Sequence, residues 1–166
     1  MHCLRFAFAV AILPVLAGVS LAGHSKAQIA AAQGFTFQGI GFKNQTSRAR
    51  ETFTEQFPES VGDAEQIDDR GRRSYEAKLP DKRILRARYE NGLLYELEIV
   101  GPRLQSSYEK LSKQFGQPDV ASGYGRSFQW ILGNIRVWLR VDQKKEVVVY
   151  HDTKHLEAGA GAAAGE

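Results

Sequence analysis

The chain has 166 residues, of which 43% are hydrophobic and 25% are charged, and its formal net charge is +3. So balanced a charge argues against nucleic acid as a partner, because nucleic-acid binding needs clustered basic side chains. Cys3 is the single cysteine, which excludes a disulfide framework and leaves the core to be held by packing alone. The length suits one domain, or two very small ones, behind a short leader.

Residues 1–22 carry the three parts of a secretory signal peptide. Arg5 supplies a positive charge, and an uncharged apolar run follows over residues 6–21. Ser20-Leu21-Ala22 then presents small residues at positions −3 and −1 of a cut before Gly23. Removal of this leader leaves 21 basic and 19 acidic residues, a net charge of +2.

We expect the leader to be cleaved rather than kept as a membrane anchor. Its apolar run contains Pro14 and is shorter than the ~20 residues that a membrane-spanning helix needs. No cysteine ends the run to take a lipid anchor. A second possible cut follows Ser25-Lys26-Ala27, so the mature chain is expected to begin at Gly23 or at Gln28. The protein is therefore predicted to be periplasmic or secreted, with no stable membrane insertion after cleavage.

The rest of the chain divides into an N-terminal segment, residues 23–38, a domain, residues 39–152, and a tail, residues 153–166. The tail consists largely of Gly and Ala, has little to bury, and is expected to be disordered. Within the domain, residues 39–101 and 102–152 have the pattern of one unit used twice.

The repeat is clearest in two helical segments. Residues 51–57 align with residues 109–115 at an offset of 58, and Glu, a large apolar residue, Gln and Phe recur at the same places. Both segments place apolar side chains on one helical face, and both are followed by a helix breaker. These signals predict helices over residues 46–57 and 104–115.

Three strand-like runs follow each predicted helix. In the first unit they are residues 74–79, 83–89 and 93–100, and in the second 127–132, 135–141 and 146–151. The predicted fold is therefore α+β, built from tandem helix-plus-three-strand repeats with the helices packed on one face of an antiparallel sheet.

The register of the first hairpin follows from matching its apolar faces. A two-residue turn at Asn91-Gly92 would put apolar side chains of one strand beside glutamates of the next. Adding Glu90 to the turn pairs Tyr89 with Leu93 and brings both apolar sets together, since a one-residue slip flips every side chain. This register also predicts one cross-strand ion pair on the outer face, Arg86 with Glu96.

The second hairpin is matched by a two-residue turn at Gly133-Asn134. That turn places six apolar side chains on the core face: Phe128, Trp130, Leu132, Ile135, Val137 and Leu139. The outer face then carries Gln129, Ile131, Arg136, Trp138 and Arg140.

Trp138 makes the outer face a candidate binding site. If the last hairpin pairs Leu139 with Val149, Tyr150 lies opposite Trp138 on the same face. Tryptophan and tyrosine beside arginines are typical of protein–protein interfaces. The predicted binding residues are Trp138, Tyr150, Arg136, Arg140 and Gln129. The alternative is that the first unit or the N-terminal segment covers this face.

Two stretches carry a family resemblance. Residues 89–99, Tyr-Glu-Asn-Gly-Leu-Leu-Tyr-Glu-Leu-Glu-Ile, and the helix exit Phe115-Gly116-Gln117-Pro118 resemble small exported bacterial proteins of tandem αββ build. The β-lactamase-inhibitor-protein-like fold and the SmpA/OmlA outer-membrane-assembly lipoproteins share that build. The resemblance covers roughly residues 39–151 and implies that a sheet face, rather than a cleft, does the binding.

Catalytic and metal patterns are weak. Glu96 and Glu98 lie on one strand face and could act as paired carboxylates, but we favour a surface ion pair, because Arg86 is predicted to lie opposite Glu96. Three residues at the end of the last strand have metal-ligand side chains: His151, Asp152 and His155. No second-shell partner can be recognised for them, and we predict no metal and no cofactor.

Two further patterns lie in loops. Asp63, Glu65, Asp68 and Asp69 resemble a calcium loop in charge but lack its alternating spacing. Asn44-Gln45-Thr46 matches a glycosylation sequon by pattern alone. The sequence therefore predicts a non-enzymatic, exported binding or inhibitor protein whose partner is a protein of the cell envelope or outside the cell. The alternatives are an envelope-assembly component and a small periplasmic enzyme or metal-binding protein.

Overall fold

The computed structural model describes residues 23–42, 49–58, 66–67, 72–90, 93–102, 107–123 and 125–154. Several sequence predictions fall outside these residues and are not addressed by the fold: the signal peptide, the sequon at Asn44, the acidic loop residues Asp63, Glu65, Asp68 and Asp69, and His155 with the tail beyond it.

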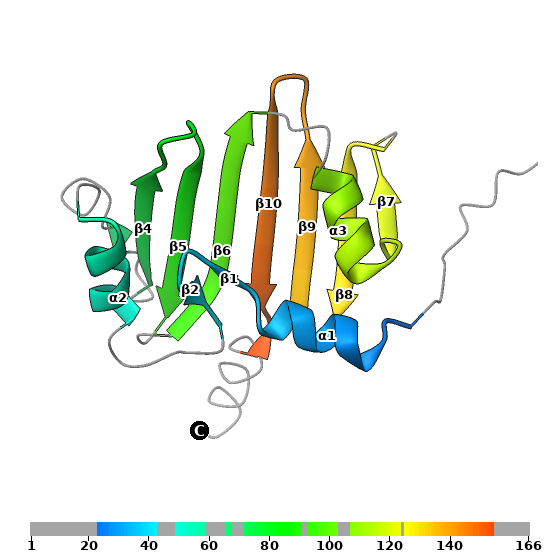
Figure 1. Ribbon diagram of the computed structural model, residues 1–166, viewed down its shortest axis with the longest axis horizontal. Coiled ribbons are helices and arrows are strands. Elements are labelled where there is room, and N and C mark those ends of the chain that lie inside the picture. The colour runs from blue at the N-terminus through cyan, green and yellow to red at the C-terminus, as the bar shows by residue number, and fades with distance from the viewer. Residues whose placement is uncertain are drawn as a thin grey trace, which may run out of the picture.

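An antiparallel sheet of eight strands runs through the described part of the chain (Figure 1), in the order β3-β4-β5-β6-β10-β9-β8-β7. The strands are β3 (Gln66–Ile67), β4 (Arg73–Lys78), β5 (Ile84–Glu90), β6 (Leu93–Pro102), β7 (Val120–Ser122), β8 (Ser127–Leu132), β9 (Ile135–Val141) and β10 (Lys145–Asp152). The six longer strands are those predicted from the sequence. The short edge strands β3 and β7 were not predicted.

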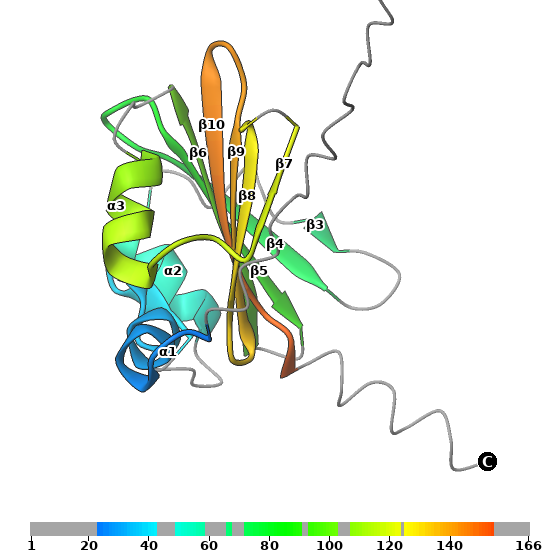
Figure 2. The same cartoon turned by 90° about the vertical axis from the view of Figure 1, so that its right-hand side faces the viewer.

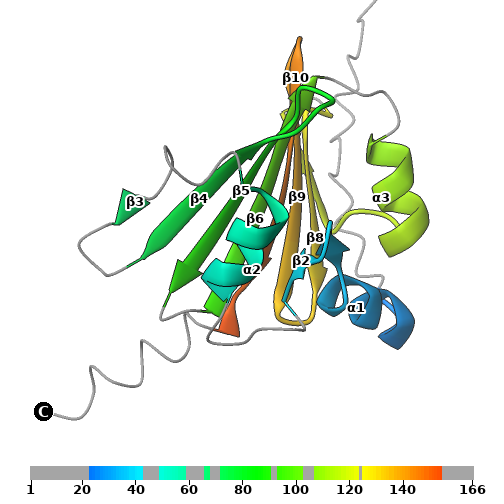
Figure 3. The same ribbon diagram turned by 60° about the vertical axis from the view of Figure 1, so that its left-hand side comes forward.

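Among the described residues, three helices lie on the same side of this sheet (Figure 2): α1 (Lys26–Gln33), α2 (Ala49–Gln56) and α3 (Ser107–Phe115). Figure 3 shows the twist of the sheet, with β3 and β4 turned away from the β8 end. A small hairpin of β1 (Thr36–Phe37) and β2 (Ile40–Gly41) connects α1 to the rest of the chain. The α+β prediction is confirmed. The segments predicted to begin α2 and α3 lie partly outside the described residues.

Helix α1 was not predicted, and it brings the N-terminal segment onto the domain. Ser25 begins it with a capping box: its hydroxyl accepts from the backbone N–H of Gln28, whose side chain accepts from the N–H of Ser25. Ala32 is fully buried, and the ring of Phe35 stacks on Tyr150 at 3.7 Å between centroids. Residues 23–42 therefore belong to the same packed unit as the sheet.

The core lies between the helices and the inner face of the sheet. Each helix contributes buried side chains: Ala32 from α1, Phe53 from α2, and Leu111 and Phe115 from α3. The strands contribute Tyr75, Leu85, Ala87, Leu97, Trp130, Leu132, Ile135, Val137, Leu139 and Tyr150, among others.

The predicted register of the second hairpin is confirmed. Leu132 lies opposite Ile135, Trp130 opposite Val137, and Phe128 opposite Leu139. Trp130 is 0% exposed, as predicted, and its indole N–H donates to the carbonyl of Gly116 at 2.9 Å.

The predicted register of the first hairpin is wrong along its whole length. Glu90 lies opposite Leu93, which is the pairing of the rejected register. A β-bulge whose extra residue is Tyr95 then restores the apolar alignment, because one added residue in a strand shifts the faces as one added residue in the turn would. Arg86 consequently pairs with Glu98, not with Glu96.

The prediction that Tyr150 lies beside Trp138 is also wrong. Val149, not Tyr150, lies opposite Trp138, and Tyr150 lies opposite Val137 on the inner face. Tyr150 is 3% exposed, and burial raises the pKa of its phenol. This one-residue difference in register moves the tyrosine from the predicted site into the core.

Candidate functional site

The face of the sheet opposite the helices, called here the outer face, carries no helix among the described residues (Figure 2). The N-terminal segment packs on the helix side through Ala32 and Phe35, so its described part does not cover this face. The first unit lies beside the second in the sheet, through the β6–β10 pair, rather than over it. Trp138 therefore faces away from the core.

Trp138 is half-buried at an open pocket of about 370 Å³. The pocket is lined by Arg88, Glu96, Glu98, Trp138, Arg140, Val147 and Val149. Val149 lies directly opposite Trp138 on β10, so the indole borders an apolar floor between charged walls. Arg136, Arg140 and Gln129 share the outer face with Trp138, as predicted.

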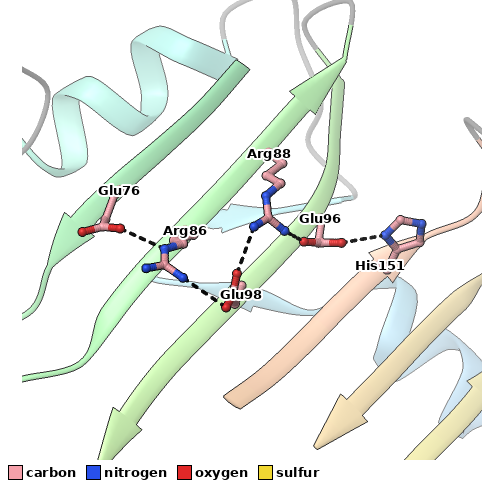
Figure 4. Close-up of polar contacts among 6 residues, drawn as sticks. All are labelled: Glu76, Arg86, Arg88, Glu96, Glu98 and His151. Carbon is pink, nitrogen blue, oxygen red and sulfur yellow. Dashed lines mark hydrogen bonds and ion pairs between the residues drawn. The ribbon is translucent and has the colours of Figure 1, made fainter. Parts of the chain in front are cut away.

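One wall of the pocket belongs to a chain of charges that we call the outer-face ladder: Glu76, Arg86, Glu98, Arg88, Glu96 and His151. Figure 4 shows the contacts, which cross from β4 through β5 and β6 to β10. The Arg86 guanidinium lies 2.8 Å from Glu76 and 3.3 Å from Glu98. Arg88 lies 3.2 Å from Glu98 and also pairs with Glu96.

The ladder decides between the two interpretations of Glu96 and Glu98. Each carboxylate accepts from Arg88, and Glu98 also accepts from Arg86. The oxygens of both carboxylates are thus already engaged by guanidinium groups. The geometry favours ion pairs over a pair of catalytic carboxylates.

His151 ends the ladder at the tryptophan. Its Nδ1 lies 3.0 Å from Glu96, and because an ionised carboxylate only accepts, Nδ1–H donates. The imidazole meets the rings of Tyr95 and Trp138 edge-on, with centroids at 5.9 and 5.8 Å. Burial is the main cause that lowers the pKa of His151; the nearby Arg72, Arg136 and Arg88 lower it further, against an upward pull from Asp152.

The lowered pKa of His151 predicts a pH-dependent stability. The unfolded chain takes up a proton at this histidine near pH 6.5, before the folded protein does, so acidification below that pH favours unfolding. We expect the melting temperature of the wild-type protein to fall relative to that of His151→Gln between pH 7 and pH 5. Thermal melts of both proteins across this range measure the effect, and a constant difference between them would contradict it.

Of the three residues with metal-ligand side chains, His155 lies outside the described residues, and His151 and Asp152 have different partners. His151 binds Glu96 on the outer face, whereas Asp152 accepts from the side-chain amide of Asn134 at 2.7 Å. Adjacent residues of a strand point to opposite faces, which separates the two. No group of three metal-ligand side chains occurs among the residues that the structure describes.

A second pocket, of about 280 Å³, lies between α1 and the end of the second hairpin. The Gln33 amide donates to Asn134 at 2.7 Å, and Asn134 donates to Asp152, so polar groups at this pocket already satisfy one another. The tryptophan pocket, with its apolar floor, is the better candidate site.

No protein-family model matches the chain, and no similar curated protein or solved structure was found. None of the described helices is long and apolar enough to cross a membrane. Function is therefore inferred from the geometry of the outer face.

Proposed function

We propose that the protein is exported and binds another protein, of the cell envelope or outside the cell, through the outer face of its sheet. The observation that carries the proposal is Trp138, half-buried on a face without a described helix, beside a pocket floored by Val147 and Val149. A large aromatic side chain at an open apolar pocket is typical of the desolvated centre of an interface.

Comparing which proteins the wild type and a Trp138 variant capture tests this proposal. Purified wild-type protein and the Trp138→Ala variant are immobilised side by side and exposed to a periplasmic extract. A protein that the wild type retains and the variant loses supports binding through this face. Equal retention of every captured protein by the two contradicts it.

We also propose that the domain arose by duplication. The strand order β3-β4-β5-β6 in one half of the sheet is matched by β7-β8-β9-β10 in the other, and the last strand of each half meets its counterpart at the centre. One helix precedes each set, α2 before the first and α3 before the second. This arrangement supports a repeat of one helix and four strands, one strand more than the sequence predicts.

If the protein is exported, the position of signal cleavage can be tested. The ring of His24 bonds the carbonyl of Phe115 at 2.8 Å and the carboxylate of Asp119 at 2.7 Å, and Ser25 caps α1. A cut after Ala27 would remove all of these contacts. We therefore expect signal cleavage before Gly23, and mass spectrometry of the protein recovered from the periplasm should find that start.

Two results would contradict this expectation in different ways. A chain that keeps Met1 in the cell means that the protein is not processed as proposed, whereas a start at Gln28 means cleavage at the second site. A protein made without residues 23–27 should melt roughly 5–10 °C lower, since a helix cap and buried hydrogen bonds contribute about 1 kcal/mol each.

A further inference from the structure

The two halves of the outer face differ in how their charges are compensated. In the first half, on β4–β6, Arg86 and Arg88 are bonded to glutamates of the ladder. In the second half, on β8–β10, strand alternation and pairing place no acidic residue at the outward-facing described positions. Those positions are Ser127, Gln129, Ile131, Arg136, Trp138, Arg140, Lys145, Val147, Val149 and His151. Among the described residues beside the tryptophan, the second half therefore keeps positive charge for a partner.

Two arginines supply that charge. Within the described residues, neither Arg136 nor Arg140 forms an ion pair; Arg136 donates to the carbonyl of Gly133 at 3.1 Å, and Arg140 is exposed. Arg140 lines the tryptophan pocket. It lies on β9, directly opposite Val147 on β10. Its guanidinium therefore lies beside the apolar floor of the tryptophan pocket.

The rest of the pocket suits a carboxylate that arrives with an apolar neighbour. Glu98 and Glu96 already bond Arg88, so a new carboxylate can pair with Arg140 without breaking the ladder. A guanidinium binds a carboxylate through two parallel hydrogen bonds, and exclusion of water by an apolar partner strengthens them. Trp138 and Val149 offer the surface for that apolar neighbour.

We propose that the second half of the outer face binds an acidic segment of a partner protein, in which an Asp or Glu pairs with Arg140 and an adjacent apolar side chain packs on Trp138. This inference rests on the proposed function and specifies the chemistry of the partner. Charge complementarity and the apolar floor favour a protein over a lipid or nucleic-acid surface, because recognition of those surfaces uses larger clusters of Lys and Arg.

Selection from a library of random displayed 12-residue peptides on the purified protein tests the proposal. We expect the enriched peptides to carry Asp or Glu beside an aliphatic or aromatic residue. The strongest binder is then synthesised in its acidic form and with the acid replaced by its amide, and both are titrated by calorimetry. Arg140→Gln should lower the affinity for the acidic peptide at least tenfold, which is the scale of one charge-assisted hydrogen-bond pair.

The control is Lys110→Gln, which removes the same charge from an exposed position on α3, on the helix side of the sheet. It should change the affinity less than twofold. The amide peptide should bind the wild type as weakly as the acidic peptide binds Arg140→Gln. The amide peptide should bind Arg140→Gln with little further loss of affinity, as expected for two groups in direct contact. Equal melting temperatures of the variants show that all are folded.

Other outcomes overturn the proposal and separate it from the proposed function. If neutral peptides are selected and lose binding in Trp138→Ala, the face binds proteins but the acidic chemistry is wrong. If acidic peptides bind wild type and Arg140→Gln equally, they dock elsewhere. If phosphatidylglycerol vesicles bind in an Arg140-dependent way and no acidic peptide does, the surface binds a membrane. If no peptide depends on Trp138 or Arg140, both proposals fail.

Discussion

Truncation of Trp130 to alanine should destabilise the domain by roughly 3–5 kcal/mol, the cost of a large cavity in a packed core. Trp130 is 0% exposed and packs near the rings of Tyr108 and Phe128. Its indole N–H also satisfies the carbonyl of Gly116, directly after α3, at 2.9 Å. The substitution therefore removes both the packing and the hydrogen bond that join the sheet to this helix.

Urea denaturation followed by circular dichroism measures the loss. Trp130→Phe keeps most of the ring but not the N–H donor, so it should cost less than the alanine. Ile131→Ala is the matched control: the next residue of β8, on the outer face and 39% exposed, should cost about 1 kcal/mol or less. Similar losses for Trp130→Ala and Ile131→Ala would contradict the assignment of the two faces.

Truncation of Trp138 should have the opposite pattern, weakening partner binding at least tenfold with little change in melting temperature. Removal of a buried interface anchor typically costs about 2 kcal/mol or more of binding free energy. The folded domain loses less, because the inward-facing neighbours Val137 and Leu139 are untouched and fully buried. Titration of the captured partner with both proteins, alongside thermal melts, measures the two effects.

Leu93→Ala provides the control for this experiment. Leu93 is 50% exposed on β6, outside the residues that line the tryptophan pocket, and its truncation should leave binding unchanged. If Trp138→Ala instead unfolds the protein, the residue belongs to the core and this face is not the site. If it changes neither stability nor binding, the partner docks elsewhere.

The α+β class, the six longer strands and the second hairpin could be predicted from the sequence alone. Apolar residues occupy every second position on both sides of Gly133-Asn134, so one register places Trp130 and Val137 together in the core. Gly133 has a φ of +65°, a conformation that glycine adopts without strain at this tight turn. Local sequence was sufficient here because the turn and both strands favour the same register.

Where the local signals were ambiguous, tertiary packing selected the register of the strands. Alternation in the first hairpin fits an extra residue in the turn or in the strand, and packing selects the bulge at Tyr95. In β10, the run Val147–Val149 fits either face, so nothing local shows that Tyr150 points inward to stack on Phe35. Helix α1 was missed because its buried face consists mainly of alanine, and its stability comes from capping and packing on the sheet.

The candidate site was likewise predicted only in part from the sequence. Alternation around Trp138 was enough to place it with Arg136 and Arg140 on the outer face, since that depends on one strand alone. The pocket and the outer-face ladder depend on the bulge in the β5–β6 pair and on the pairing of β6 with β10, two strands that are far apart in the chain. Tertiary packing sets both the bulge that places Arg88 opposite Glu96 and the β6–β10 register that places His151 opposite Glu96, so these contacts became visible only in the folded structure.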